Sequence, residues 1–142
     1  MSETYPSRLN LLSSQSASSS ASIIFTQISS NFSTYYLKIR KLVPATDATA
    51  LYVQFSTDGG STWITTTTYN VTTQAINSAG NNTSDRNISA TESMICNQMS
   101  NATTEPTYCD LVFYNLNQST YHPKFISESM GTHWDSLGNV TY

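Results

Sequence analysis

The sequence predicts an all-β protein, an antiparallel β-sandwich with a jelly-roll-like strand arrangement. Apolar and polar residues alternate in several short runs, the pattern of strands that bury one face. Proline, aspartate and glycine separate these runs and indicate turns. No window combines the apolar spacing of a helix with good helix formers. The length of 142 residues fits one folded domain.

The N-terminal region differs from the rest in composition. Residues 13–22 read SSQSASSSAS, which is typical of a linker, and Leu9, Leu11 and Leu12 before them predict a short edge strand. We therefore expect residues 1–22 to form a Ser-rich arm with an edge strand, and residues 23–142 to form the β-sandwich domain. An ordered arm of small residues is explained most simply by packing against a neighbouring subunit.

Two strands with one buried face are predicted next, at residues 35–40 and 51–55. In the first, Tyr35 and every second residue after it form the apolar face, and in the second Leu51 begins that face. The intervening PATD predicts a turn. Asp58, Gly59 and Gly60 predict a tight hairpin after the second strand, because glycine accepts positive φ.

The later elements are predicted from composition as well as alternation. Residues 63–69 are almost entirely threonine and aromatic, which favours a strand, and residues 109–114 indicate a strand buried on both faces. Mostly polar stretches, in which Met99 is the one large apolar residue, predict exposed loops at residues 77–86 and 97–106. Weaker strand candidates are residues 22–28, 88–96 and 121–127.

Composition excludes several classes of function. Six Lys and Arg against nine Asp and Glu give a net charge of −3, too few cations for a nucleic-acid-binding face. No apolar run is long enough to cross a membrane. The opening MSETYPSRLN lacks the apolar segment of a secretory signal, so we expect synthesis in a host cytoplasm. Polarity comes instead from 23 serines, 21 threonines and 12 asparagines.

The residues that carry catalytic or metal chemistry are few and badly spaced. The only histidines are His122 and His133, and neither stands in a pattern that predicts a Ser-His-Asp triad. The two histidines with Cys96 and Cys109 make four zinc-type ligands, but without the close pairs that preorganise zinc sites. Asp58 is the one carboxylate of its loop, too few for calcium. We expect no catalytic residue, metal or cofactor, and no enzyme activity.

Cys96 and Cys109 leave two alternatives open. They lie 13 positions apart and flank a polar loop. A disulfide that closed this loop would stabilise the fold by about 3 kcal/mol in the chain-entropy model. Synthesis in a reducing cytoplasm favours two buried free thiols instead.

Five aromatic residues are candidates for stacking on sugar rings or for an interface: Trp63, Tyr69, Trp134, Tyr36 and Tyr52. Tyr36 and Tyr52 lie on the outward sides of their predicted strands. The alternative is that Trp63 and Tyr69 fill the core or an interface.

Asparagine sequons add a second alternative for the surface. Eight asparagines begin an N-x-Ser/Thr sequon, against about four expected by chance in so Ser/Thr-rich a chain. An exported chain would carry glycans there. The sequons are at Asn31, Asn70, Asn81, Asn82, Asn87, Asn101, Asn117 and Asn139.

Several motifs carry a family resemblance. SASIIFTQI is followed by STYYLKIRKLVPATDATALYVQFSTDGGSTW, and LVFYNLNQSTYHPKF comes later. This order resembles short β-rich structural proteins of tailed bacteriophages, over residues 9–69 above all. The resemblance implies a jelly-roll-like sandwich in a virion, as in capsid decoration, head-fibre or tail-fibre proteins, and it brings no catalytic residues. The Gly-rich closing strands of that family are missing after Tyr142, so the chain is a shortened member or another chain completes its sheet.

We therefore expect a virion structural protein that coats or projects from a phage particle. Sheet edges and Ser/Thr-rich faces would pair with copies of the chain, expected as a trimer, and with capsid or tail proteins. The alternative is a tail-fibre or carbohydrate-binding module that recognises host-surface glycans. No nucleic acid or membrane partner is expected.

Overall fold

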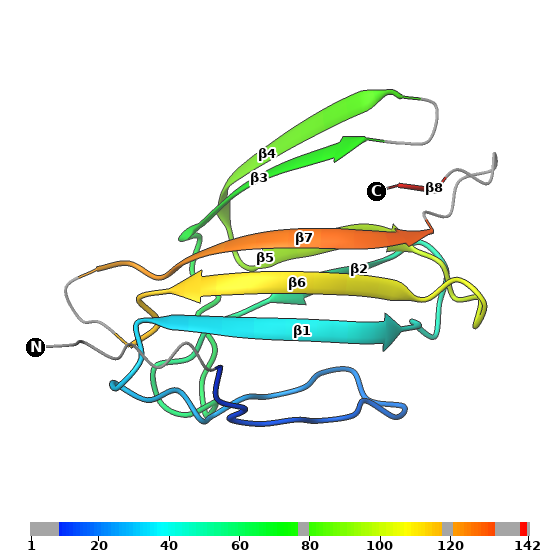
Figure 1. Ribbon diagram of the computed structural model, residues 1–142. Coiled ribbons are helices and arrows are strands. Elements are labelled where there is room, and N and C mark those ends of the chain that lie inside the picture. The colour runs from blue at the N-terminus through cyan, green and yellow to red at the C-terminus, as the bar shows by residue number, and fades with distance from the viewer. Residues whose placement is uncertain (1–8, 77–79, 118–120, 133–139, 142) are drawn as a thin grey trace, which may run out of the picture.

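The computed structural model describes residues 9–76, 80–117, 121–132 and 140–141 (Figure 1). Every strand pairing in this part of the chain is antiparallel, and these residues form no helix. The all-β antiparallel prediction is therefore confirmed. The strands are β1 (Thr34–Leu42), β2 (Thr49–Val53), β3 (Tyr69–Ile76), β4 (Asn82–Ala90), β5 (Ser93–Met99), β6 (Thr107–Tyr114), β7 (Lys124–Thr132) and β8 (Val140–Thr141).

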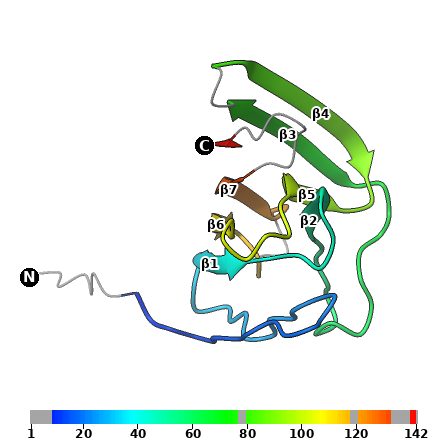
Figure 2. The same ribbon diagram turned by 90° about the vertical axis from the view of Figure 1, so that its right-hand side faces the viewer.

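The strands form two facing layers and a projecting hairpin. One sheet has the order β1-β6-β7-β8, and β2 pairs with β5 in the second layer beside it (Figure 2). Strands β3 and β4 pair with each other and extend beyond both layers. The pairs are nested along the chain: β3 with β4, β2 with β5 around them, and β1 with β6 outermost. This nesting places residues far apart in sequence side by side.

The core lies between the two layers and is built by strand alternation. Leu111 and Cys109 on β6 are each 1% exposed, and Tyr35, Ile95 and Phe113 complete the buried cluster. Removing a side chain such as Leu111 from water contributes about 2 kcal/mol. The predicted alternation of residues 35–40 is confirmed, because Tyr35, Leu37 and Ile39 pack inward and the residues between them are exposed.

Four aromatic rings extend this core toward the loop after β2. Phe55 stacks on Tyr69 at a ring-centroid distance of 6.0 Å and meets Phe113 edge-on at 6.1 Å. Phe125 on β7 lies 5.5 Å from Phe113. Aromatic contacts of this kind add about 1 kcal/mol each beyond the area that they bury. They join β7, β6 and the start of β3 in one cluster.

The strand predicted at residues 63–69 is wrong, since residues 54–68 form a loop and β3 begins only at Tyr69. Hydrogen bonds to the Tyr69 hydroxyl and between backbone groups stabilise the loop. Tyr69 Oη accepts the N–H of Phe55 at 2.9 Å and donates to the Ile64 carbonyl at 3.0 Å, while Ile64 N–H donates to the Phe55 carbonyl at 2.8 Å. One phenol thus satisfies backbone groups that a strand would have paired with a neighbour.

The hairpin predicted at residues 58–60 is wrong, because β2 pairs with β5 and no strand follows until Tyr69, but these residues do form a turn. Gly59 and Gly60 have φ of 73° and 92°, values that residues with a side chain rarely adopt. Asp58 closes the turn by accepting the N–H of Thr62 at 2.9 Å and the hydroxyl of Ser56 at 2.7 Å. The carboxylate is therefore engaged by its own loop.

Four further expectations need correction. Residues 82–86 and 97–99 were expected in loops but belong to β4 and β5, which pair with β3 and β2. The candidate strand at residues 88–96 is split into β4 and β5 by a turn. Strand β6 is not buried on both faces, since Tyr108 and Tyr114 are exposed. No strand forms at Leu9, Leu11 and Leu12 or at residues 22–28, where no partner strand supplies hydrogen bonds.

Three of the five strand ladders contain a bulge beside a residue with positive φ. The register of β1 with β6 shifts between Ile39 and Leu42, and Lys41 there has φ of 56°. Gln98 (52°) and Ser89 (62°) lie opposite the shifts in the β2–β5 and β3–β4 ladders. A left-handed residue in a bulge turns the strand and increases its twist.

Candidate functional site

Residues 9–33, which combine the described part of the predicted Ser-rich arm with the segment that leads to β1, form no strand and expose large apolar side chains. We call this whole stretch the N-terminal arm. It runs along the open lower side of the two layers (Figures 1 and 2). Leu9 is 74% exposed and Leu11 is 86% exposed. Extended chain with so much apolar surface in water is unfavourable, at about 25 cal/mol for each Å² left uncovered. Leu12, Ile23, Ile24 and Ile28 are exposed as well.

The second half of the arm is attached to the domain. The hydroxyl of Tyr35 accepts the N–H of Ser29 at 2.8 Å and donates to the Ser29 carbonyl. Ile24 packs beside Gly60, where an added methyl group would come within 3.3 Å of Ile24 Cγ2. Gln15 Nε2 donates to the Ile24 carbonyl at 2.6 Å and folds the first half back on the second. The arm is therefore held in place while its leucines stay uncovered.

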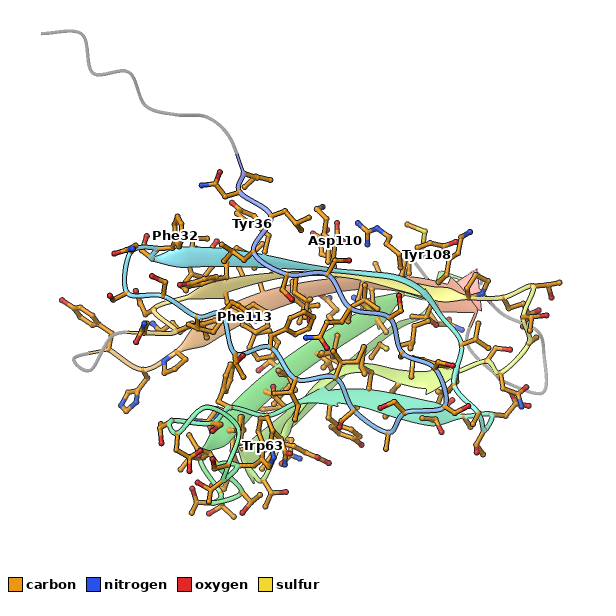
Figure 3. The ribbon with its side chains drawn as sticks, turned by 90° about the horizontal axis from the view of Figure 1, so that it is seen from below. Phe32, Tyr36, Trp63, Tyr108, Asp110 and Phe113 are labelled. Atoms are coloured by element: carbon orange, nitrogen blue, oxygen red, sulfur yellow. The ribbon has the colours of Figure 1, made fainter. Side chains whose placement is uncertain are left out.

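The outer face consists of the side chains of β1, β6 and β7 that point away from the second layer. Figure 3 shows Tyr36, Tyr108 and Asp110 on this face and Phe113 turned toward the interior. The register aligns Tyr36, Val112 and Ile126 in one row across the three strands. Exposed fractions of 55% for Tyr36 and 63% for Ile126 make the row an apolar strip, and Tyr108, Tyr114 and Met130 are exposed beside it.

A charged group lies next to this strip. Asp110 contacts Arg40 Nη1 at 2.5 Å and Lys38 Nζ at 3.1 Å. The hydrogen bond from Arg40, followed by that from Lys38, lowers the pKa of Asp110 below its usual value. All three side chains are about half exposed, so the ion pairs contribute little stability and serve mainly to orient charge on the face.

The five aromatic residues predicted as a group do not form one platform. Tyr36 is on the outer face, whereas Tyr69 is buried against Phe55. Trp63 packs over Gly60 in the loop after β2 and is partly exposed. Trp134 lies outside the described residues. Tyr52 belongs to a separate surface, between the β2–β5 pair and the β3–β4 hairpin.

Tyr52 borders an open hollow of about 430 Å³ between the β2–β5 pair and the β3–β4 hairpin. Strand β4 contributes Asn87 to its lining, the turn before β5 contributes Glu92, and β5 contributes Asn97. The tyrosine ring is nearly half exposed. The hollow thus combines one aromatic ring with amide and carboxylate groups.

Cys96 and Cys109 face each other across the core, from β5 in one layer and β6 in the other. Both are free, and Cys96 packs against the buried cluster that contains Cys109. The contact with Cys96, together with burial, raises the pKa of Cys109, while the hydrogen bond from Cys109 lowers the pKa of Cys96. Cys109 is enclosed, but Cys96 is only partly buried.

The remaining predicted ligands are not gathered with the cysteines. His122 is exposed just before β7, and His133 lies outside the described residues. Within the described ranges, no group of three or more His, Cys, Asp or Glu side chains is placed to hold a metal ion. The same part of the chain has no helix long and apolar enough to span a membrane.

Sequence reasoning missed most of the outer face. Tyr108, Tyr114 and Ile126 were read as core residues or were not singled out. The alternation in β6 carried the signal, because Cys109, Leu111 and Phe113 already filled one face and left the tyrosines on the other. In β6, one apolar face is therefore buried and the other is exposed.

Comparison with known proteins gave no match. A scan against protein-family models, a search of curated proteins and a search of solved structures each found nothing similar.

Proposed function

We propose that the protein is a non-catalytic virion structural protein, a subunit that acts by assembling with copies of itself on a phage particle. The observation that carries the proposal is the N-terminal arm, which the domain holds by its second half while Leu9 and Leu11 remain in water. A neighbouring copy is the occupant that we assign to those leucines. The apolar strip of the outer face supplies a second surface that the same association can bury.

The nested strand pairing supports the jelly-roll-like part of the proposal. Jelly rolls arise when a long antiparallel ribbon folds over so that successive pairs enclose one another, and β3–β4, β2–β5 and β1–β6 follow that path. The resemblance of residues 9–69 to short phage structural proteins points to the virion as the location. Capsid or tail proteins are the further partners proposed, in a decoration or fibre role.

The first experiment measures the solution mass of the full chain by light scattering on a sizing column. We expect an oligomer, with a trimer as the specific expectation. Deleting residues 1–20 should lower the oligomer mass more than it lowers the melting temperature. An unchanged mass after the deletion would contradict the role given to the arm.

A full-length variant tests the leucines without shortening the chain. Replacing Leu9, Leu11 and Leu12 by serine removes the exposed apolar surface and should weaken self-association at least tenfold. The matched control replaces Ser16, Ser18 and Ser20 by alanine in the same arm, and should associate like the wild type. Equal effects of the two variants would show that the leucines are not the contact.

The hollow beside Tyr52 favours a second candidate function, the recognition of host-surface glycans. A partly exposed tyrosine with amide and carboxylate neighbours suits a sugar ring, which stacks on the aromatic face and hydrogen-bonds at its edge. A glycan array followed by calorimetry on the strongest binder tests it. Tyr52→Ala should weaken binding about tenfold, while Tyr36→Ala on the outer face should leave it unchanged. No binding to the array would remove this candidate.

A further inference from the structure

We propose that Cys96 and Cys109 form a two-electron oxidation site, at which a small-molecule disulfide converts the two thiols into a bridge between the layers of the sandwich. The strands that carry them belong to different sheets, β5 paired with β2 and β6 between β1 and β7. The bridge would therefore join the layers directly, and not only close the loop at residues 100–106. This inference does not depend on the proposed function.

Both cysteines already pack in the core between the two layers. Cys109 belongs to the buried cluster with Leu111 and Ile95, and Cys96 packs against that cluster from the facing layer. The loop between β5 and β6 is fixed on its own. Ser100 Oγ donates to Glu105 Oε2 at 2.8 Å, and Asn101 N–H donates to Asp47 Oδ1 at 2.8 Å. These hydrogen bonds fix the loop that connects β5 and β6 before any disulfide forms.

The unequal environments of the two thiols set the order of the reaction. Cys96 is partly exposed, and its thiolate is favoured by the hydrogen bond from Cys109 and by a backbone hydrogen bond from Leu51. Cys109 is 1% exposed, out of reach of a bulky oxidant. Cys96 is therefore the attacking thiol, since the thiolate is the nucleophile and must meet the oxidant at the surface.

The chemistry balances with a disulfide such as oxidised glutathione. The Cys96 thiolate attacks one sulfur of the reagent, its S–S bond breaks, and one thiolate leaves. Cys109 then loses its proton and attacks Cys96 Sγ, which forms the Cys96–Cys109 bond and expels the second thiolate. The two released thiolates take up the two protons lost by the protein. The dithiol is oxidised by two electrons, and the reagent is reduced by the same two.

The test treats the native full-length chain with oxidised glutathione and follows thiol content, intact mass and melting temperature. The wild type should lose both thiols and about 2 Da, with no attached glutathione. Its melting temperature should rise by roughly 5–10 °C, and reduction should reverse the change.

Two single variants separate the roles of the cysteines. Cys109→Ser should stop at a mixed disulfide of Cys96 with glutathione, and Cys96→Ser should remain unmodified because Cys109 is enclosed. Circular dichroism of both variants under reducing conditions checks that they fold. The proposal is overturned if the native wild type keeps its thiols, stays glutathionylated at Cys96 or links two chains. It is also overturned if oxidation occurs only after denaturation.

Discussion

Thr107 is a buried residue whose hydroxyl has no hydrogen-bond partner in the described part of the chain. An unsatisfied hydroxyl in the interior loses its bonds to water and gains nothing in return. We expect Thr107→Val, which keeps the shape and removes the hydroxyl, to raise the free energy of unfolding by about 1 kcal/mol. Urea denaturation measures it. Thr107→Ser, which keeps the hydroxyl and loses a methyl group, should destabilise; a less stable valine variant would contradict the reasoning.

Asp58 gives the loop after β2 a defined pH dependence. Hydrogen bonds from Thr62 and then Ser56 lower its pKa from 3.8 to about 2. Because the folded pKa lies below the unfolded one, the carboxylate stabilises the loop above about pH 4, and this contribution is lost as the pH falls toward 2. The protection factor of the Thr62 amide against hydrogen exchange should fall over that window. In Asp58→Asn this pH-dependent fall should be missing, and an identical profile would refute the assignment.

At the scale of the element, the β1–β6, β2–β5 and β3–β4 ladders each contain a bulge that the sequence did not reveal. Tyr35–Leu37–Ile39 and Cys109–Leu111–Phe113 were predicted as inward faces because burial repeats every second residue. The positive φ at Lys41, Ser89 and Gln98 could not be predicted, because none of these residues is glycine. The strand predicted at residues 63–69 failed for a related reason: the phenol of Tyr69 offers the backbone a local alternative to a partner strand.

The bulge in β1 supports a prediction at Lys41. A left-handed non-glycine residue costs about 1 kcal/mol, which glycine avoids. Lys41→Gly should therefore be more stable than Lys41→Ala by up to about 1 kcal/mol. At Lys38, in regular strand on the same element, the order should reverse, with glycine less stable than alanine by about 1 kcal/mol. Thermal denaturation of the four variants compares the two sites, and the same order at both would show that the bulge is not strained.

At the scale of the whole molecule, the proposed assembly makes stability depend on concentration. Association that occurs only between folded chains adds to the free energy of unfolding as the protein concentration rises. We expect the melting temperature of the wild type to increase by several degrees over a hundredfold concentration range. The variant with serine at residues 9, 11 and 12 should show a smaller increase over the same concentration range. A concentration-independent wild type would contradict assembly through the arm.

The sequence predicted the fold class better than it predicted the surfaces and sites that we propose to be functional. Local alternation identifies a strand and its buried face, but the partner of that strand is chosen by long-range packing, so the nested pairing of β1 with β6 was not predictable. The same limit applies to Tyr52 and the hollow, which β2, β3, β4 and β5 build together. Cys96 and Cys109 were singled out from their spacing, yet their position in opposite layers follows from topology alone.

The twist that Lys41 introduces into β1 has a consequence for how copies can meet. Strand β1 ends its sheet, and a flat terminal strand would recruit further strands without limit, as amyloid does. The bulge, with Lys38, Arg40 and Lys41 along the strand, makes that edge a poor template for backbone pairing. Growth into fibrils is thereby discouraged at β1, and the assembly that we propose would have to use the side chains of the arm and the outer face instead.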